Sequence, residues 1–106
     1  MDINKLTAVY FVGAGGIGMS ALIRYFLAKG KRVGGYDKTP SDLTEELKKE
    51  GADMHYEDNV ALIGEAFKSP DDTLVVYTPA VPESLTELTY FRAHGFEVMK
   101  RARVLG

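Results

Sequence analysis

The chain has 106 residues, of which 45% are hydrophobic and 26% charged, values typical of one globular domain. Its formal net charge of −2 provides no general basic field, so we expect no nucleic-acid partner. The sequence contains no cysteine, which excludes disulfides and thiolate chemistry. Because no apolar run approaches the roughly 18 residues of a membrane span and residues 1–5 lack a signal-peptide layout, we expect a cytoplasmic protein with no membrane partner.

The first predicted elements are a strand over residues 7–12 and a helix over residues 17–29. The stretch that joins them, residues 13–18, reads GAGGIG. This is the G-x-G-x-x-G pattern in the context that it requires, after a strand and at the start of a helix. The sequence therefore predicts a phosphate-binding loop here rather than a glycine-rich turn without a ligand.

Each glycine of the pattern has an expected role. Gly13 should permit the tight turn after the strand, Gly15 should let the main chain approach a pyrophosphate, and Gly18 should let helix and strand pack closely. The free N–H groups of the first helical turn would then point at the anion, which the helix dipole also favours. Ser20 could add its hydroxyl to a phosphate or satisfy only its own helix.

Strands and helices alternate along the rest of the chain. The predicted elements are strand 32–36, a helix with Thr39 as N-cap that ends at Gly51, strand 53–56, a helix through 60–67 capped by Asp58 or Asn59, strand 73–77, a helix opened by a capping box at Ser84 and Glu87 and ended at His94, and strand 96–99. This alternation predicts a Rossmann-like, doubly wound α/β domain, a parallel sheet of about five strands in the order 3-2-1-4-5 with helices on both faces.

Ligands of such sheets bind outside the carboxyl ends of the strands, at the point where the strand order reverses. Residues 13–20 and 78–80 are therefore expected to form opposite walls of one crevice, with Asp37 and His55 to one side. Asp37 lies nineteen residues after Gly18, where dinucleotide-binding domains place the carboxylate that holds a ribose; the alternative is a solvated turn residue.

Other candidate side chains have competing explanations. Thr39 could reach the same ligand as Asp37, although its capping role is sufficient to explain it. His55 ends a strand beside the crevice, whereas most single histidines in turns have no chemical role. Lys100 and Arg101 would face an anionic ligand, a second domain or only solvent.

Several chemical signatures are missing from the sequence. It has no G-x-x-x-x-G-K-[ST] loop, which leaves no obvious ATP site, and no metal-ligand cluster or nucleophile–base pair at a recognisable spacing. We therefore expect this chain to hold a nucleotide, to contain no catalytic residue and no metal site, and to perform no reaction alone.

The residues resemble a known family, the Mur ligases, and most closely its branch that joins L-alanine to UDP-N-acetylmuramate. Residues 11–20, FVGAGGIGMS, resemble the loop FxGIGGIGMS that binds the diphosphate of the UDP-sugar in that branch, with Ala14 in place of isoleucine. Residues 35–37 are similar to the family's Gly-Ser-Asp, whose aspartate lies near the uridine. Tyr36 departs from that serine, so the resemblance leaves its role open.

Three later segments also resemble the family. His55 and Asn59 match a His…Asn segment that follows the third strand. Residues 75–81, VVYTPAV, resemble Val-Val-Ser-Ser-Ala-Ile, with Thr-Pro in place of two serines. Residues 100–102 resemble the Arg-Arg-Ala that precedes the linker to the next domain.

The resemblance covers essentially the whole chain and implies these substrate-binding residues: Gly13, Ala14, Gly15, Gly16, Ile17, Gly18, Met19, Ser20, Asp37, Thr39, His55, Thr78, Pro79, Ala80 and Arg101. Residues 1–106 would be the UDP-sugar domain alone, with a central ATPase domain and a C-terminal domain of the same chain as partners. ATP and Mg²⁺, which activate the muramoyl carboxylate before the amine of alanine attacks, would bind outside this chain. The UDP-sugar domain itself would hold no cofactor.

Two other classes of function stay open at this stage. An NAD(P)-binding domain of a dehydrogenase would use the same loop and Asp37, although no second segment clearly seats the nicotinamide half. A nucleotide-sensing module without catalytic activity would explain the absence of catalytic residues equally well. Selective binding of a uridine diphosphate sugar over NAD would exclude both.

Overall fold

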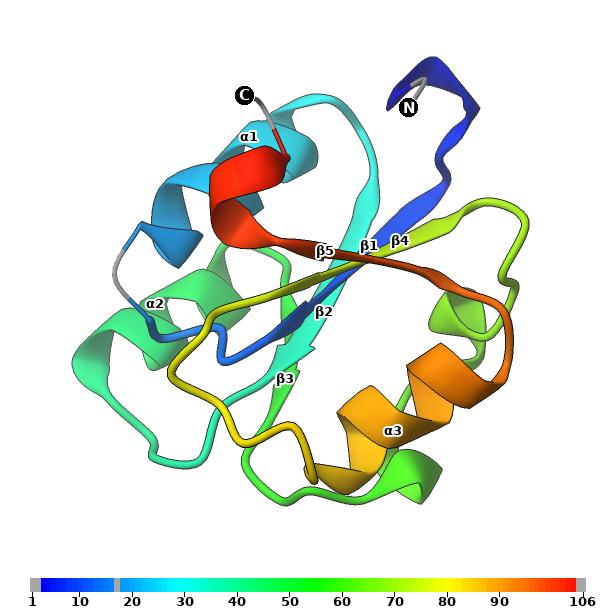
Figure 1. The fold of residues 1–106 in the computed structure, drawn as a ribbon. Coiled ribbons are helices and arrows are strands. Elements are labelled where there is room, and N and C mark those ends of the chain that lie inside the picture. The colour runs from blue at the N-terminus through cyan, green and yellow to red at the C-terminus, as the bar shows by residue number, and fades with distance from the viewer. Residues whose placement is uncertain (1–2, 17, 105–106) are drawn as a thin grey trace.

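The computed structural model describes residues 3–16 and 18–104. Its strands form one parallel, five-stranded sheet in the order β3-β2-β1-β4-β5, which confirms the predicted order (Figure 1). The strands are β1 (Ala8–Val12), β2 (Arg32–Tyr36), β3 (Asp53–His55), β4 (Thr73–Tyr77) and β5 (Glu97–Lys100). The helices are α1 (Met19–Ala28), α2 (Asp42–Lys49) and α3 (Thr86–Ala93), with 3-10 turns η1 (Ile3–Lys5), η2 (Val60–Leu62), η3 (Glu65–Phe67) and η4 (Arg101–Arg103).

Helices cover both faces of the sheet, as predicted. Alternate residues of β1 point to opposite sides: Val9 and Phe11 join the core beneath α1 and α2, while Tyr10 and Val12 join the core beneath α3, η2 and η3. Every residue of β1 and β4 is buried, as expected for central strands of a parallel sheet. Among the described residues, no helix combines the length and apolar character needed to cross a bilayer.

Each bound of a predicted strand lies within one residue of the observed one, whereas two helices differ from prediction. The first helix begins at Met19, and the predicted start, Ile17, lies outside the described residues. The predicted helix through 60–67 is wrong, because η2 and η3 are separate turns joined by extended backbone at Ile63 and Gly64. This break places the Phe67 ring against β2, where it packs in the same core as Tyr10.

Two predicted helix caps are also wrong. Ser41, not Thr39, caps α2: its hydroxyl accepts from the Thr44 N–H at 3.2 Å, and the Thr44 hydroxyl accepts from the Ser41 N–H at 2.9 Å. Ser84 and Glu87 do not form a capping box for α3. The Asp58 carboxylate, from the loop after β3, accepts the first N–H groups of that helix instead, at 2.7 and 2.9 Å.

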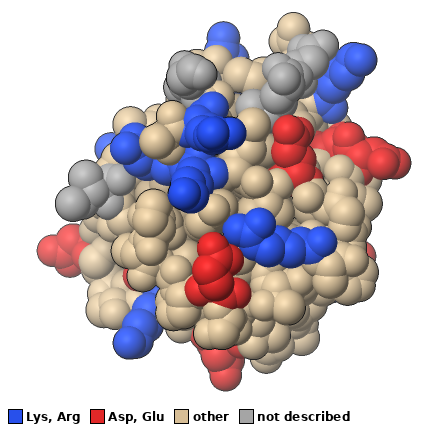
Figure 2. Space-filling model, in the orientation of Figure 1, with Lys and Arg blue, Asp and Glu red and all other residues tan. Residues whose placement is uncertain are grey.

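The turn η4 brings the last described residues beside the start of α1 (Figure 1). Val104 packs into the core beneath α1 and α2. The three basic residues of this segment, Lys100, Arg101 and Arg103, are exposed, and basic side chains gather over η4 in Figure 2. None of the ion pairs formed by the described residues includes any of these three.

Candidate functional site

A cavity of about 490 Å³ opens at the carboxyl ends of β1, β2 and β4. The glycine loop lines one wall through Gly13, Gly15 and Gly16, and the segment after β4 lines the other through Thr78 and Ala80. The two stretches therefore share one crevice at the reversal of strand order, as their positions in the sequence predict.

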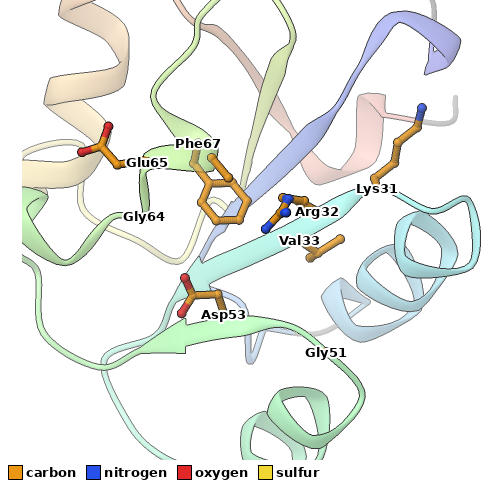
Figure 3. A pocket seen from close by; sticks show the side chains of 9 residues that line it. Lys31, Arg32, Val33, Gly51, Asp53, Gly64, Glu65 and Phe67 are labelled. Atoms are coloured by element: carbon orange, nitrogen blue, oxygen red, sulfur yellow. The ribbon is translucent and has the colours of Figure 1, made fainter.

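A second hollow, of about 370 Å³, lies at the opposite end of β2 (Figure 3). It is lined by both charge signs, including Lys31, Arg32, Asp53 and Glu65, and by the Phe67 ring. None of the predicted site residues lines it. Because ligands of doubly wound sheets bind at the carboxyl ends of the strands, the first cavity is the candidate site.

Two glycines of the loop have left-handed backbone. Gly13 has φ of +85°, and a Cβ added there would lie 2.5 Å from Thr78 Cγ2, which confirms the tight turn beside β4. Gly18 has φ of +80° at the N-cap position of α1. The packing role expected of Gly18 is wrong, because an added Cβ would meet the Arg101 guanidinium at 2.9 Å rather than a strand.

Gly15 approaches a carboxylate of its own chain. Its N–H donates to Asp37 Oδ2 at 2.7 Å, and the Thr39 N–H donates to Asp37 Oδ1 at 3.0 Å. A Cβ added to Gly15 would lie 2.8 Å from that Oδ2 and 3.2 Å from Thr44 Cγ2. The absence of a side chain at Gly15 is therefore required by Asp37 and α2 even without a ligand.

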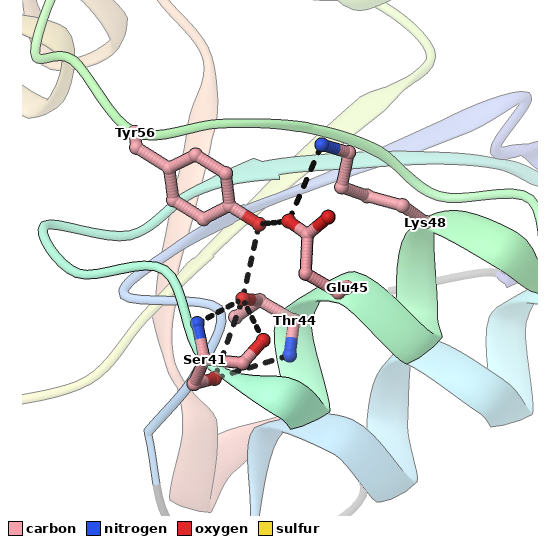
Figure 4. A network of polar contacts seen from close by, with 5 residues as sticks. All are labelled: Ser41, Thr44, Glu45, Lys48 and Tyr56. Carbon is pink, nitrogen blue, oxygen red and sulfur yellow. Dashed lines mark hydrogen bonds and ion pairs between the residues drawn. The ribbon is translucent and has the colours of Figure 1, made fainter.

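The first turn of α2 supports the loop through Thr44, which is fully buried. Figure 4 shows its hydroxyl among the polar groups of Ser41 and Tyr56. The Tyr56 hydroxyl lies 3.0 Å from Thr44 Oγ1 and donates to the Glu45 carboxylate. These contacts join the loop after β3 to the helix that packs against the glycine loop.

Most described N–H groups of the glycine loop are already used within the chain. Gly13 and Ala14 donate to Tyr36 O, Gly16 to Gly13 O, Met19 to Gly16 O, and Gly15 to Asp37. The Gly18 N–H, in contrast, has no hydrogen-bond acceptor among the described residues. With the exposed Arg101 beside it and the helix dipole behind it, this is the part of the loop best suited to an anion.

His55 does not line the cavity; it lies in a largely buried polar cluster, with its ring 6.0 Å from that of the lining residue Tyr36, centroid to centroid. Its Nε2 lies 2.7 Å from Glu87 Oε2, which also accepts the Asn59 N–H at 3.0 Å. The Tyr10 hydroxyl donates to Glu87 Oε1. Burial, followed by the charge of Glu87, raises the pKa of Tyr10 far above the ordinary tyrosine value.

Six of the predicted site residues line the cavity: Gly13, Gly15, Gly16, Asp37, Thr78 and Ala80. The others lie elsewhere: Ala14 and Met19 in the core, Gly18, Ser20 and Arg101 around the start of α1, Thr39 and Pro79 in exposed turns, His55 against Glu87, and Ile17 outside the described residues. Sequence reasoning did not select Lys38, Asp58, Val81, Pro82 and Leu85, which also line the cavity, and it left Tyr36 without a role. Within the described chain, no cluster of His, Asp and Glu is placed to hold a metal ion.

The parallel sheet, its order reversal and the glycine loop define a Rossmann-like, doubly wound α/β domain. Residues 8–106 match the model of the Mur ligase family, catalytic domain, and the chain belongs to this family.

Named relatives agree with this assignment. The chain is 97% identical over 106 residues to the UDP-N-acetylmuramate–L-alanine ligase of Parabacteroides distasonis, and 66% identical to that of Phocaeicola vulgatus. All of this chain matches, but it spans only 23% of either relative. The crystal structure of the UDP-N-acetylmuramate-alanine ligase of Thermotoga maritima is similar with a TM-score of 0.80 and 26% identity, over 92% of this chain and 21% of that one.

Proposed function

We propose that residues 1–106 are the UDP-N-acetylmuramate-binding domain of an ATP-dependent ligase that adds L-alanine to this UDP-sugar in peptidoglycan precursor synthesis. The observation that carries the proposal is a cavity at the switch point of the sheet, next to the start of α1. There the exposed Arg101 guanidinium lies against Gly18, whose N–H has no acceptor among the described residues. The names of relatives up to 97% identical supply the substrate.

The diphosphate is assigned to the start of α1. The Gly18 N–H and the Arg101 guanidinium, which lie side by side there, would donate to its oxygens. The nucleoside would occupy the cavity beside Asp37, and Thr78 and Ala80 would bound it on the other side. This arrangement leaves the sugar and its carboxylate free to face the domain that performs the chemistry.

In this proposal the chain binds the UDP-sugar, and another domain of the full-length enzyme performs the reaction. Its described residues form no metal-ligand cluster, and its sequence has no P-loop. In the full-length enzyme, ATP and Mg²⁺ on the central domain would convert the muramoyl carboxylate to an acyl phosphate, which the amine of alanine attacks with loss of phosphate. The residues of this chain would bind and orient the UDP-sugar in the cytoplasm, with the central and C-terminal domains as partners.

An NMR amide-shift titration of the chain tests the proposal against the two other classes. UDP-N-acetylmuramate should shift the amides of Gly13–Ser20, Asp37 and Thr78–Ala80, whereas NAD and NADP should not. A response to NAD or NADP instead would make this a dehydrogenase domain. No response to any of the three would refute substrate binding by this domain alone.

Arg101 and Arg103 offer a matched pair of variants, because both are exposed in the same short turn. R101A should weaken UDP-N-acetylmuramate binding by roughly tenfold, the loss typical of a charge-assisted hydrogen bond, and R103A should not. Equal losses would show that only the general positive charge of η4 acts on the diphosphate.

A further inference from the structure

The methyl group and the hydroxyl of Thr44 face different parts of the chain. The methyl group faces the glycine loop, since a Cβ added to Gly15 would lie 3.2 Å from Thr44 Cγ2. The hydroxyl accepts the Ser41 N–H at 2.9 Å and lies 3.0 Å from both the Ser41 carbonyl oxygen and the Tyr56 hydroxyl oxygen (Figure 4). Because Thr44 is fully buried, water does not compete for these contacts.

These contacts determine the side-chain rotamer of Thr44. Threonine is branched at Cβ, so a rotation about χ1 moves its hydroxyl and its methyl group together. In a helix threonine divides between two rotamers, because its hydroxyl can bond a carbonyl of the preceding turn. Tyr56 provides a partner from outside the helix, which favours one orientation of the hydroxyl and thereby keeps the methyl group against Gly15.

Tyr56 is itself held in place by two residues of α2. Its hydroxyl donates to the Glu45 carboxylate, and the Lys48 ammonium lies over its ring, 5.3 Å from the centroid. Lys48 also pairs with Glu45 at 3.3 Å. Because the Tyr56 proton goes to Glu45, the Tyr56 oxygen is available to accept the proton of Thr44. None of these four residues lines the cavity.

Gly15 connects Thr44 to the cavity. Gly15 lines the cavity together with Asp37, and its N–H donates to Asp37 Oδ2 at 2.7 Å. A Cβ added to Gly15 would lie 2.8 Å from that oxygen, so the loop is packed closely between the carboxylate and the Thr44 methyl group. A displacement of the methyl group therefore changes the position of the Gly15 N–H relative to Asp37.

We propose that Thr44, held by Tyr56, is a positioning residue for the UDP-sugar. It fixes the main chain at Gly15 and, through the Gly15 N–H, the Asp37 carboxylate beside which the nucleoside would bind. Neither Thr44 nor Tyr56 contacts the ligand. The proposal rests on the proposed function and adds two residues outside the cavity that determine its affinity. A threonine that only completed the α2 cap would affect stability and leave affinity unchanged.

Three variants separate positioning from capping. T44S keeps the hydroxyl and removes the methyl group that faces Gly15. Y56F removes the partner from outside the helix and keeps the ring. S41A is the matched control, because it removes the other half of the cap but keeps the Ser41 N–H and carbonyl that bond the Thr44 hydroxyl. Thermal unfolding should show all three variants folded at room temperature.

The first measurement is the amide proton shift of Gly15 in the chain without ligand, which reports the hydrogen bond to Asp37. T44S and Y56F should move this resonance upfield, because the bond lengthens, and S41A should not. The second measurement is the affinity for UDP and for pyrophosphate by calorimetry or NMR titration. T44S and Y56F should bind UDP about threefold to tenfold more weakly, the loss expected for one hydrogen bond, with unchanged pyrophosphate binding. S41A should match the wild type with both ligands.

The remaining outcomes separate this proposal from the proposed function. Wild-type UDP affinity in T44S and Y56F would overturn the positioning role and leave the proposed function standing. An equal loss of UDP affinity in S41A would show that the cap alone acts, and would also overturn it. An unmoved Gly15 resonance in T44S would overturn it whether or not the chain bound UDP. A wild-type chain that did not bind UDP would refute the proposed function and the positioning role together.

Discussion

Glu87 is a buried carboxylate that joins α3 to β1, β3 and the loop after β3, and its removal should be strongly destabilising. It is fully buried in α3, yet it joins the Tyr10 hydroxyl of β1, the His55 ring at the end of β3 and the Asn59 N–H of the following loop. E87A would remove the acceptor of all three groups at once. The variant therefore tests whether this cluster, and not apolar packing alone, fixes these elements.

The magnitude follows from the groups left behind. A buried donor without a partner costs about 1–3 kcal/mol, and breaking one side of a buried, hydrogen-bonded pair costs about 3–5 kcal/mol. Tyr10 recovers part of this loss, because its hydroxyl already lies 3.1 Å from His55 Nε2. We therefore expect E87A to lower the free energy of unfolding by about 3–5 kcal/mol, a large share of the 5–15 kcal/mol typical of a domain.

E87Q and E83A complete the series. E87Q keeps the shape and one acceptor oxygen, so its loss should fall near 1–2 kcal/mol. Glu83 precedes the same helix, but its side chain is 71% exposed and pairs with Arg92 at 3.4 Å. Such an exposed pair contributes about 0–1 kcal/mol, so E83A should lie close to the wild type.

The assay is urea unfolding followed by circular dichroism at pH 7. With a slope of about 1–3 kcal/mol/M, E87A should move the midpoint down by about 1 M or more, while E83A should move it little. If the free energies of unfolding of E87A and E83A differed by less than about 0.5 kcal/mol, the polar cluster would add nothing to the stability that packing supplies, and the reasoning would fail.

Three further predictions concern the backbone, the helix caps and pH. G13A and G30A both place a side chain at left-handed φ, at about 1–2 kcal/mol, but only the Gly13 Cβ would meet another atom within 4 Å, so urea unfolding should show the larger loss for G13A. S41A should cost about 1 kcal/mol as loss of the α2 cap, whereas S84A should be neutral; the reverse order would restore the predicted capping box. The pKa of Tyr10 is higher in the folded protein than in the unfolded chain, so its contribution to stability is complete below about pH 10. Above about pH 10 the free energy of unfolding should fall by up to about 1.4 kcal/mol per pH unit, because the unfolded chain loses the Tyr10 proton first. Y10F removes this proton, so urea unfolding should show a smaller fall in the free energy of unfolding with pH.

The parts of the structure that could be predicted are those with short-range signals. Glycines at fixed spacing between a strand and a helix identify the loop, and alternation of apolar strands with helices identifies the sheet and its switch point. The cavity between the glycine loop and residues 78–80 follows from this topology alone. Local pattern and global fold agree at these positions, which is why the sequence suffices there.

The parts that could not be predicted depend on residues far apart in the chain. Asp58 caps a helix that begins 28 residues later, and Glu87 bonds Tyr10 across 77 residues. The neighbouring sequence predicts that Glu87 forms a capping box with Ser84. The Glu87 side chain instead points inward, to the buried hydrogen-bonding groups of Tyr10 and His55 and the N–H of Asn59. Similarly, Ser41 displaces Thr39 as a cap because only Ser41 has Thr44 three residues later to complete the reciprocal pair.

Asp37 shows how the loop motif and the acidic residue of the fold are coupled. In dinucleotide-binding domains of this fold, the glycine loop binds the phosphates and the carboxylate binds the ribose. Here the Asp37 carboxylate accepts the Gly15 N–H, so one donor of the loop is already satisfied by an anion of the chain. A phosphate at Gly15 would compete with this carboxylate and be repelled by it. A phosphate at Gly18 would instead meet Arg101 and an N–H that has no acceptor among the described residues. The diphosphate is therefore expected nearer the start of α1 than the glycine spacing alone implies, which leaves the outer face of Asp37 to the nucleoside.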